Sequence, residues 1–229
     1  FYLDGNLVWE DDGFTPPGAP SGTATLGAQR SGSSPWRGRL DAVRFYDRAF
    51  TADEVALAAA EPDRGDPDDT ALAYAYAFDG NAYDDGPAAN HAQVIGTPTA
   101  VPAMLDQGFA LTGSESFSLG RLTALESGAE LTLSLWLRVD LGLTTADQNL
   151  VLFDHLAGDE GLRLEVAAST AQGPGQITAH FGGATATTLL LTTAGGHFPD
   201  DGAWHHLALT LGEAPDGARA ALYLDGLLV

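Results

Sequence analysis

The 229-residue sequence contains no cysteine and no lysine, and it has a single methionine. Without cysteine the chain can form no disulfide, no metal–thiolate site and no cysteine nucleophile. It also lacks any run that approaches the roughly 18 apolar residues of a membrane-spanning helix. Neither an N-terminal methionine nor a signal peptide is present, so we expect the sequence to be a fragment whose export signal lies upstream.

Basic residues are scarce as well. Ten arginines face 31 acidic residues, which gives a formal net charge of −21. So acidic a chain is a poor partner for nucleic acid or an anionic membrane, because both require a positively charged contact surface. The charge favours solubility and suits cation binding or a salty medium. We therefore expect no nucleic acid among the partners and no insertion into a membrane.

One heptapeptide occurs near both ends of the chain. Tyr2–Val8 reads YLDGNLV and Tyr223–Val229 reads YLDGLLV, so the two differ at one position. Asp-Gly between apolar residues predicts a two-residue hairpin turn, in which both central residues need a positive φ. The spacing of the two copies exceeds the roughly 20–50 residues of solenoid periods and matches a whole β domain. Our interpretation is a window from an array of repeated β domains that begins and ends within a domain.

Short segments of alternating polarity fill much of the sequence. The clearest is Leu131–Val139, in which Leu and Val alternate with Thr, Ser, Trp and Arg, and Trp204–Leu211 repeats the pattern. Such alternation predicts half-buried β-strands. Many short strands separated by turn residues predict an all-β fold, an antiparallel jelly-roll sandwich with one short helix.

The one helix is expected shortly after residue 50. Thr51 and Glu54 have the spacing of a capping box, in which each side chain accepts a hydrogen bond from the backbone N–H of the other residue. The helix is expected at Val55–Ala60, and Pro62 ends it. Residues 61–71 then hold two prolines and five acidic residues, which is the composition of an acidic linker.

Six segments form an ordered set that is specific to one type of domain: Gly38–Val55, Ala75–Asp84, Gly108–Gly113, Leu131–Arg138, Gly202–Ala208 and Leu222–Gly226. Together they resemble laminin-G-like domains of the concanavalin A-like lectin/glucanase superfamily, of the bacterial tandem-repeat type. Ala75–Asp84 resembles the strand and loop that open such a domain, Gly38–Val55 resembles the strand and helix that close it, and the other four resemble the strands between them. The resemblance covers most of the chain and implies a jelly-roll sandwich.

The order of these segments suggests a domain boundary within the chain, because the closing segment precedes the opening one. Residues 1–60 would then be the C-terminal portion of one laminin-G-like domain and residues 72–229 the N-terminal portion of the next, joined by the linker at 61–71. The alternative is one permuted jelly roll, in which residues 1–60 fill the place that residues 72–229 leave open.

The resemblance also implies a calcium site where the start and the end of a domain meet. The matching positions are Asp79, Asn81 and Asp84 in the opening loop and Asp41 in the closing strand. Carboxylate and amide oxygens are the hard ligands that Ca²⁺ takes. The alternative is that Asp and Asn beside Gly are ordinary turn residues. In a tandem array Asp41 and Asp79 would serve different copies, so the chain would hold two half-sites.

Trp136, Trp204 and His206 lie on the opposite strand faces from the leucines of their strands. They could form a concave surface that binds glycan or protein, or they could pack beneath a cover on that side of the sheet. His205 is expected on the core face with a hydrogen-bond partner. Because adjacent strand residues project to opposite faces, His205 and His206 cannot bind the same metal ion.

The sequence does not indicate an enzyme. Glucanases of this superfamily need paired carboxylates around the scissile bond, and the resemblance implies a Glu-x-Asp-x-x-Glu spacing. No strand carries it, and the nearest match, Glu61–Asp66, lies in the acidic linker. The sequence also contains no serine nucleophile elbow, no HExxH motif and no phosphate-binding loop.

These observations lead to one main functional hypothesis and two alternatives. The main one is a non-catalytic, extracellular or cell-surface recognition or adhesion module for glycan or protein, stabilised by calcium. The first alternative is a structural repeat of a surface filament or stalk, whose partners are neighbouring copies of itself. The minor alternative is a glycan-active enzyme of the same superfamily.

Overall fold

The computed structural model describes most of the chain from residue 22 onwards. Residues 63–69, 127–129, 140–148, 158–159, 169–173, 183–187, 194–197, 199 and 215–216 lie outside the description. Before residue 22 it describes two paired strands, β1 (Tyr2–Leu3) and β2 (Asn6–Leu7), as expected for the first hairpin. For residues 188–190, 213–214 and 217–218, as for β1 and β2, only the backbone is described. The greater part of the expected linker, at 63–69, lies outside the described residues.

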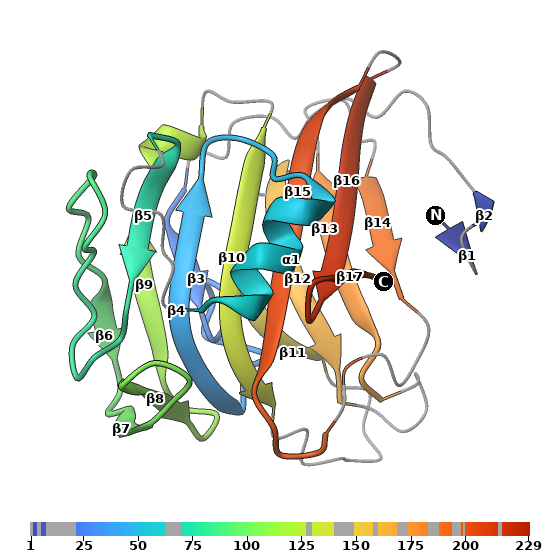
Figure 1. Cartoon of the computed structure of the whole chain (residues 1–229). Coiled ribbons are helices and arrows are strands. Elements are labelled where there is room, and N and C mark those ends of the chain that lie inside the picture. Colours follow the sequence, from blue (N-terminus) through green and yellow to red (C-terminus); the bar gives the residue numbers. More distant parts are fainter. Residues whose placement is uncertain are drawn as a thin grey trace.

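Two antiparallel sheets are stacked face to face (Figure 1). In the larger sheet the described strands follow the order β17-β16-β15-β10-β4-β8-β7, and β5 also pairs with β4. These strands are β4 (Gly38–Tyr46), β5 (Leu72–Tyr76), β7 (Thr99–Pro102), β8 (Gln107–Leu111), β10 (Leu131–Val139), β15 (His205–Ala214), β16 (Gly217–Leu224) and β17 (Leu227–Leu228).

The smaller sheet follows the order β14-β13-β12-β11-β3-β9-β6 in the described residues. Its strands are β3 (Ala24–Leu26), β6 (Gln93–Ile95), β9 (Ser116–Gly120), β11 (Asn149–Ala157), β12 (Glu160–Ala167), β13 (Ile177–Gly182) and β14 (Thr188–Thr192). The helices are α1 (Ala52–Ala60) and the short 3₁₀ helix η1 (Thr123–Leu125). The prediction of an antiparallel jelly-roll sandwich with one short α-helix is confirmed. No helix in the described part is both long and apolar enough to cross a membrane.

The core lies between the two sheets and follows the predicted alternation. Leu133, Leu135 and Leu137 of β10 are fully buried and pack in the same cluster as Leu152 and Leu164 of the smaller sheet. The alternation did not predict β6 and β7, because their side chains are mostly exposed and show no apolar face.

Strand β4 occupies the centre of the larger sheet. It pairs with β10 along one edge, while β8 and β5 share the other edge. Strand β3 likewise lies between β11 and β9 in the smaller sheet. Strands from residues 22–60 are therefore flanked by strands from residues 72–229 in both sheets, which is the arrangement of a single jelly roll. How the natural chain divides into domains stays a prediction.

Helix α1 covers the outer face of the larger sheet (Figure 1). Its only buried side chain, Val55, packs against Ala208 of β15 and Tyr223 of β16. The capping box is present: the Thr51 hydroxyl accepts from the Glu54 N–H at 3.3 Å, and Glu54 Oε2 accepts from the Thr51 N–H at 2.8 Å. The helix therefore begins directly after the cap, three residues earlier than the apolar pattern indicated.

Replacing Thr51 by Ala is expected to lower the free energy of unfolding by about 1 kcal/mol, because the Glu54 N–H loses its acceptor. Urea denaturation of the wild type and the variant measures the difference. Thr51→Ser keeps the hydroxyl and serves as the matched control, with a much smaller loss expected. Equal stability of the wild type and the Ala variant would contradict the capping argument.

Candidate functional site

A β-bulge in β4 determines which side chains reach the outer face of the larger sheet. Between Ser134 and Trp136 the pairing of β10 with β4 shifts by one residue, and Ala42 has a φ of 48° at this point. The extra residue places both Leu40 and Val43 in the core, so Asp41 and Arg44 both lie on the outer face. Asp41 is thereby aligned with Trp136 across the strand pair.

Asp41 is fully buried on this outer face. Its Oδ2 accepts a hydrogen bond of 2.7 Å from the Leu105 N–H, in the loop between β7 and β8, while its Oδ1 has no partner among the described residues. Burial raises the pKa of Asp41 to about 6, and the charge of Asp79 adds to the effect, although backbone hydrogen bonds oppose it. A carboxylate in this position is costly to keep charged at neutral pH.

Asp79 lies close to Asp41, as the predicted calcium site requires. It lines a cavity of about 170 Å³ that is also bordered by Ala42, Arg44 and Leu105. The Oδ1 of Asp79 accepts a hydrogen bond of 3.0 Å from the Gln107 N–H. The guanidinium of Arg44 donates to the Pro62 carbonyl rather than to either aspartate. The fold thus brings together two of the four predicted ligands, one from each end of the proposed domain boundary.

The other two predicted ligands are engaged within their own loop. Asp84 is buried, and its carboxylate accepts from the backbone N–H groups of Ala75, Gly86 and Asn90 at 2.7–2.9 Å. Asn81 accepts from the Tyr83 N–H at 2.8 Å through its Oδ1. These bonds hold the loop after β5 in shape, which is the turn role that the sequence left open as an alternative.

The residues fit a cation only in part. The unpartnered buried oxygen of Asp41, beside a second carboxylate, is a site that a cation would stabilise. Among the described residues, however, no group of three or more His, Asp and Glu is arranged to hold a metal ion. Calcium at Asp41 and Asp79 would need further oxygen ligands, and it stays a prediction.

A second cavity, which we call the aromatic pocket, lies between the C-terminal half of α1 and the larger sheet. Its volume is about 390 Å³, and its lining includes Trp136, Trp204, His205, Asp225 and Met104. Trp204 is half-buried, whereas Trp136 is almost fully buried. Two of the three aromatic residues predicted to bind a ligand therefore meet at one cavity, and Trp204 is the more accessible of them.

His206 does not line the aromatic pocket. It is buried, with its ring 5.4 Å from that of Trp136 and its Nε2 2.9 Å from the Ser134 hydroxyl. Burial lowers the pKa of His206 to about 4, and the charge of Arg44 contributes, while Asp225 opposes the shift. The imidazole is therefore neutral at physiological pH, and its position matches the packing alternative.

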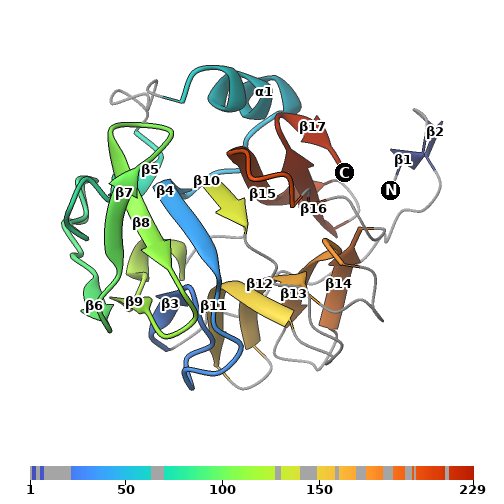
Figure 2. The same cartoon turned by 90° about the horizontal axis from the view of Figure 1, so that it is seen from below.

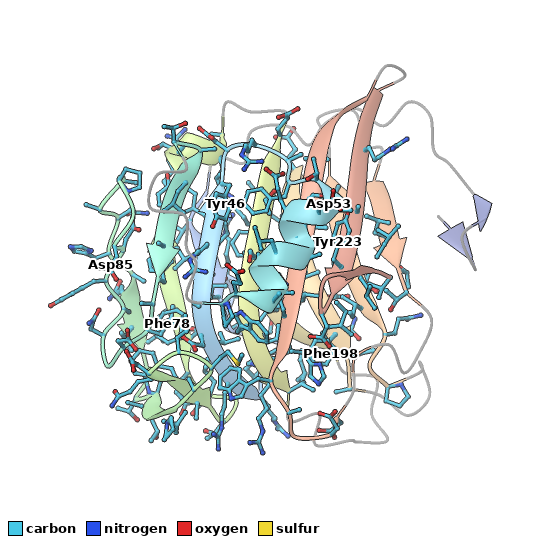
Figure 3. All side chains as sticks on the ribbon, viewed as in Figure 1. Tyr46, Asp53, Phe78, Asp85, Phe198 and Tyr223 are labelled. Atoms are coloured by element: carbon cyan, nitrogen blue, oxygen red, sulfur yellow. The ribbon has the colours of Figure 1, made fainter. Side chains whose placement is uncertain are left out.

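The pKa of the neighbouring His205 is shifted in the opposite direction, upwards. The Nδ1 of His205 lies 2.8 Å from Asp225 Oδ2 and its Nε2 lies 3.2 Å from Asp201 Oδ1. Its ring packs edge-on against Phe198, which is labelled in Figure 3. Burial works against protonation, but the hydrogen bonds to the two carboxylates outweigh it and raise the pKa of His205. Sequence reasoning expected a partner for His205 but missed both acids, which come from separate turns.

Asp225 connects this network to the hairpin that ends the chain. Asp225 and Gly226 have φ values of 50° and 80°, as the type I′ turn between β16 and β17 requires. The Asp225 carboxylate also accepts from the His206 N–H at 2.9 Å. The turn that was predicted as a hairpin signal therefore supplies a carboxylate to the rim of the aromatic pocket.

Comparisons with known proteins identify the family. A laminin G-type family model, described as the concanavalin A-like lectin/glucanases superfamily, matches residues 1–56 and 111–229. Searches of curated proteins and of solved structures gave no match. The matched residues are more than half of the chain and include five of the eight residues that line the aromatic pocket, namely Ala56, Trp136, Trp204, His205 and Asp225. The chain therefore belongs to the concanavalin A-like lectin/glucanases superfamily.

Proposed function

We propose that the domain is a non-catalytic binding module for a glycan or protein ligand, at the cell surface or outside the cell. The observation that carries this proposal is the aromatic pocket, where a half-buried Trp204 borders a cavity of about 390 Å³. Ligand pockets typically measure about 300–1,000 Å³ and combine apolar walls with a few polar groups. His205 and Asp225 are the polar groups here.

The chemistry of the lining suits a sugar ring or an apolar side chain. The indole of Trp204 offers a flat apolar surface, and the short side chains of Ala56, Ala59 and Ala60 on α1 leave room opposite it. At the rim, the half-exposed carboxylate of Asp225 can accept hydrogen bonds and the imidazole of His205 can donate them. Trp136 also lines the pocket, but it is almost fully buried and offers a ligand little exposed surface.

Replacing Trp204 by Ala is expected to abolish binding to any ligand found by screening the wild-type domain on a glycan array and an extracellular protein array. The variant should stay folded, because Trp204 is only half-buried. Tyr83→Ala is the matched control, since this exposed aromatic residue lines neither the aromatic pocket nor the cavity beside Asp79. Unchanged binding by the Trp204 variant, with near-native circular dichroism, would rule out the aromatic pocket as the site.

A structural repeat remains the second candidate because both sheets end in exposed apolar edge strands. Leu227 and Leu228 of β17 are 72% and 48% exposed, and Val94 and Ile95 of β6 are also exposed. Unpaired edges of this kind favour strand addition by another chain. If the domain assembles through β17, light scattering should detect association that rises with concentration, and Leu227→Lys should abolish it. A monomer at every concentration would exclude this route.

The buried carboxylates of the smaller sheet give little support to an enzymatic role, because each is paired with another side chain. Asp154 is paired with Arg163 at 3.2 Å, and Glu165 is held by Asn149 and His180 at 2.6 Å and 2.9 Å. Carboxylates that are tied to such partners are poorly suited to act as acid and nucleophile around a glycosidic bond.

A further inference from the structure

The largest of the three cavities lies at one end of the larger sheet, where β4 begins and β8 and β10 end. Figure 2 views the sandwich from this end. The cavity has a volume of about 730 Å³, and its lining includes Arg37, Arg39, Arg138, Asp200 and Asp201. We call it the arginine pocket, since it gathers three of the ten arginines of a chain whose net charge is −21.

Two of these arginines oppose each other directly. Arg39 of β4 and Arg138 of β10 are cross-strand partners on the outer face of the sheet. Like charges in directly opposed positions destabilise an antiparallel pair. The repulsion between Arg39 and Arg138 lowers the stability of the folded chain, although many acidic residues are available to pair with an arginine. The same arrangement would help to bind an anion.

No acidic side chain neutralises the three guanidinium groups in the described part of the chain. Arg48, Arg121 and Arg163 each pair with a carboxylate. In the described residues, the guanidinium groups of the three pocket arginines make no hydrogen bond and no ion pair. The Nε of Arg37 is buried without an acceptor. Buried guanidinium donors without acceptors favour a planar or tetrahedral oxyanion as a ligand, because it can accept several of them at once.

The acids at the rim do not fill this role. Asp201 Oδ1 already accepts from the Ala203 N–H at 2.8 Å and from His205 at 3.2 Å, and Asp200 is exposed. Gly202, with a φ of 74°, also lines the pocket, and a Cβ there would lie 3.4 Å from Arg138 Nη2. Three positive charges therefore face a space large enough for a ligand.

The arginine pocket and the aromatic pocket are neighbours. Trp136 and Arg138 project from the same face of β10, and Asp201 of the arginine pocket is bonded to His205 of the aromatic pocket. A chain of sugar units could stack on Trp204 and place an acidic substituent among the arginines. We propose that the arginine pocket binds the carboxylate or sulfate groups of an acidic polysaccharide; this rests on the proposed function, which it deepens.

Calorimetry at low salt with polygalacturonate, dextran sulfate and uncharged dextran tests the proposal. The wild-type domain should bind at least one of the two acidic polymers and bind dextran more weakly. Arg39→Gln and Arg138→Gln should each weaken acidic binding at least tenfold, about the effect of losing one charge-assisted hydrogen bond. Arg39→Lys should be intermediate for polygalacturonate, because it keeps the charge and loses the fork geometry.

The matched control is Arg121→Gln, which removes the same charge from an exposed residue that lines neither pocket and should leave the affinity unchanged. Thermal unfolding should show no loss of stability for Arg39→Gln, because the substitution relieves the opposed charges. A stable Arg39→Gln variant with wild-type affinity would overturn the proposal, and so would equal binding of dextran and both acidic polymers. Binding of poly-glutamate in preference to both polysaccharides would also overturn it, in favour of an acidic peptide.

The two pockets can fail separately. If the arginine variants lose acidic binding while Trp204→Ala does not, the arginine pocket stands and the aromatic pocket is not the site. If Trp204→Ala alone abolishes binding, the proposed function stands and the arginine pocket is not a ligand site. The preferred acidic polymer identifies the anion, a carboxylate for polygalacturonate or a sulfate for dextran sulfate.

Discussion

Replacing Asp41 by Asn is expected to raise the free energy of unfolding at pH 7 by about 3 kcal/mol in the absence of divalent cations. Burial raises the pKa of Asp41 to about 6 from its ordinary value of 3.8, and each pKa unit corresponds to about 1.4 kcal/mol. Asn removes the charge, and its carbonyl oxygen can still accept from the Leu105 N–H. The gain is the cost of keeping a buried, half-partnered carboxylate ionised.

The pH dependence follows from the direction of the shift. Because the folded pKa of Asp41 lies above the unfolded value, the folded state binds this proton more tightly, and stability falls as the pH rises from about 4 to about 6. Urea denaturation at several pH values should therefore show the advantage of Asp41→Asn growing across this interval. It should be nearly absent at pH 4 and constant above pH 7.

Asp84→Asn is the matched control, because it makes the same chemical change at a buried aspartate with a different environment. The Asp84 carboxylate accepts three backbone N–H groups, and an amide cannot satisfy all of them. Its substitution should therefore lower stability by about 1–3 kcal/mol. Destabilisation by both variants at pH 7 with chelator present would contradict the account of Asp41.

The same variant tests the proposed cation. If calcium binds at Asp41 and Asp79, added Ca²⁺ should raise the melting temperature of the wild type and leave Asp41→Asn unaffected, so that the difference between them shrinks. A wild-type melting temperature that is equal in calcium and in chelator would contradict the predicted calcium site at Asp41 and Asp79. The desolvation of Asp41 would still stand.

The second large effect is expected from His206, with the opposite dependence on pH. Burial lowers its pKa to about 4 from 6.5, so the unfolded chain takes up the proton first as the pH falls. The contribution of neutral His206 to stability is retained above pH 6.5 and is lost between about 6.5 and 4, by about 3 kcal/mol in total. His206→Gln cannot titrate, so as the pH falls through this interval the stability of the variant relative to the wild type should rise.

The measurement for His206 is the slope of stability against pH rather than stability itself, because Gln also alters the packing against Trp136. His91→Gln is a suitable control, since that imidazole is exposed beside Tyr83 and does not belong to β10 or β15. Equal slopes for the wild type and His206→Gln would show that His206 is not held neutral by the fold.

The effects of Asp41 and His206 are expected to oppose each other in the wild type. Between pH 6 and pH 4 protonation of Asp41 stabilises the folded state, while uptake of a proton by His206 in the unfolded state opposes it. A nearly flat wild-type profile would therefore conceal two steep contributions. The single variants separate them, since each removes one of the two titrations.

Local features of the fold were predictable because a few neighbouring residues decide them. The alternation in Leu131–Val139 places leucines in the core, Thr51 and Glu54 cap α1, and Asp225-Gly226 makes the type I′ turn. Each depends on side chains within about ten residues of one another, which is the range over which periodicity and turn chemistry act. The family resemblance added the order of the strands, and the family match supports it.

The candidate sites were predictable only in part. Asp79 lies near Asp41 and Trp204 lines the aromatic pocket, but Asp84 is occupied with backbone N–H groups and His206 is buried. The arginine pocket was missed altogether, although Arg37, Arg39 and Arg138 are plain in the sequence. Nothing in their local pattern indicates that Arg39 and Arg138 become cross-strand partners.

The sequence by itself determined most of the strands, the capped helix, the Asp-Gly turn, the acidic net charge and the superfamily. The tertiary structure decided what the polar side chains do. Strand β4 pairs with strands from three later parts of the chain, and its bulge at Ala42 turns Asp41 toward Trp136 and Asp79. Contacts between residues so far apart depend on strand pairing and register, which no local pattern encodes.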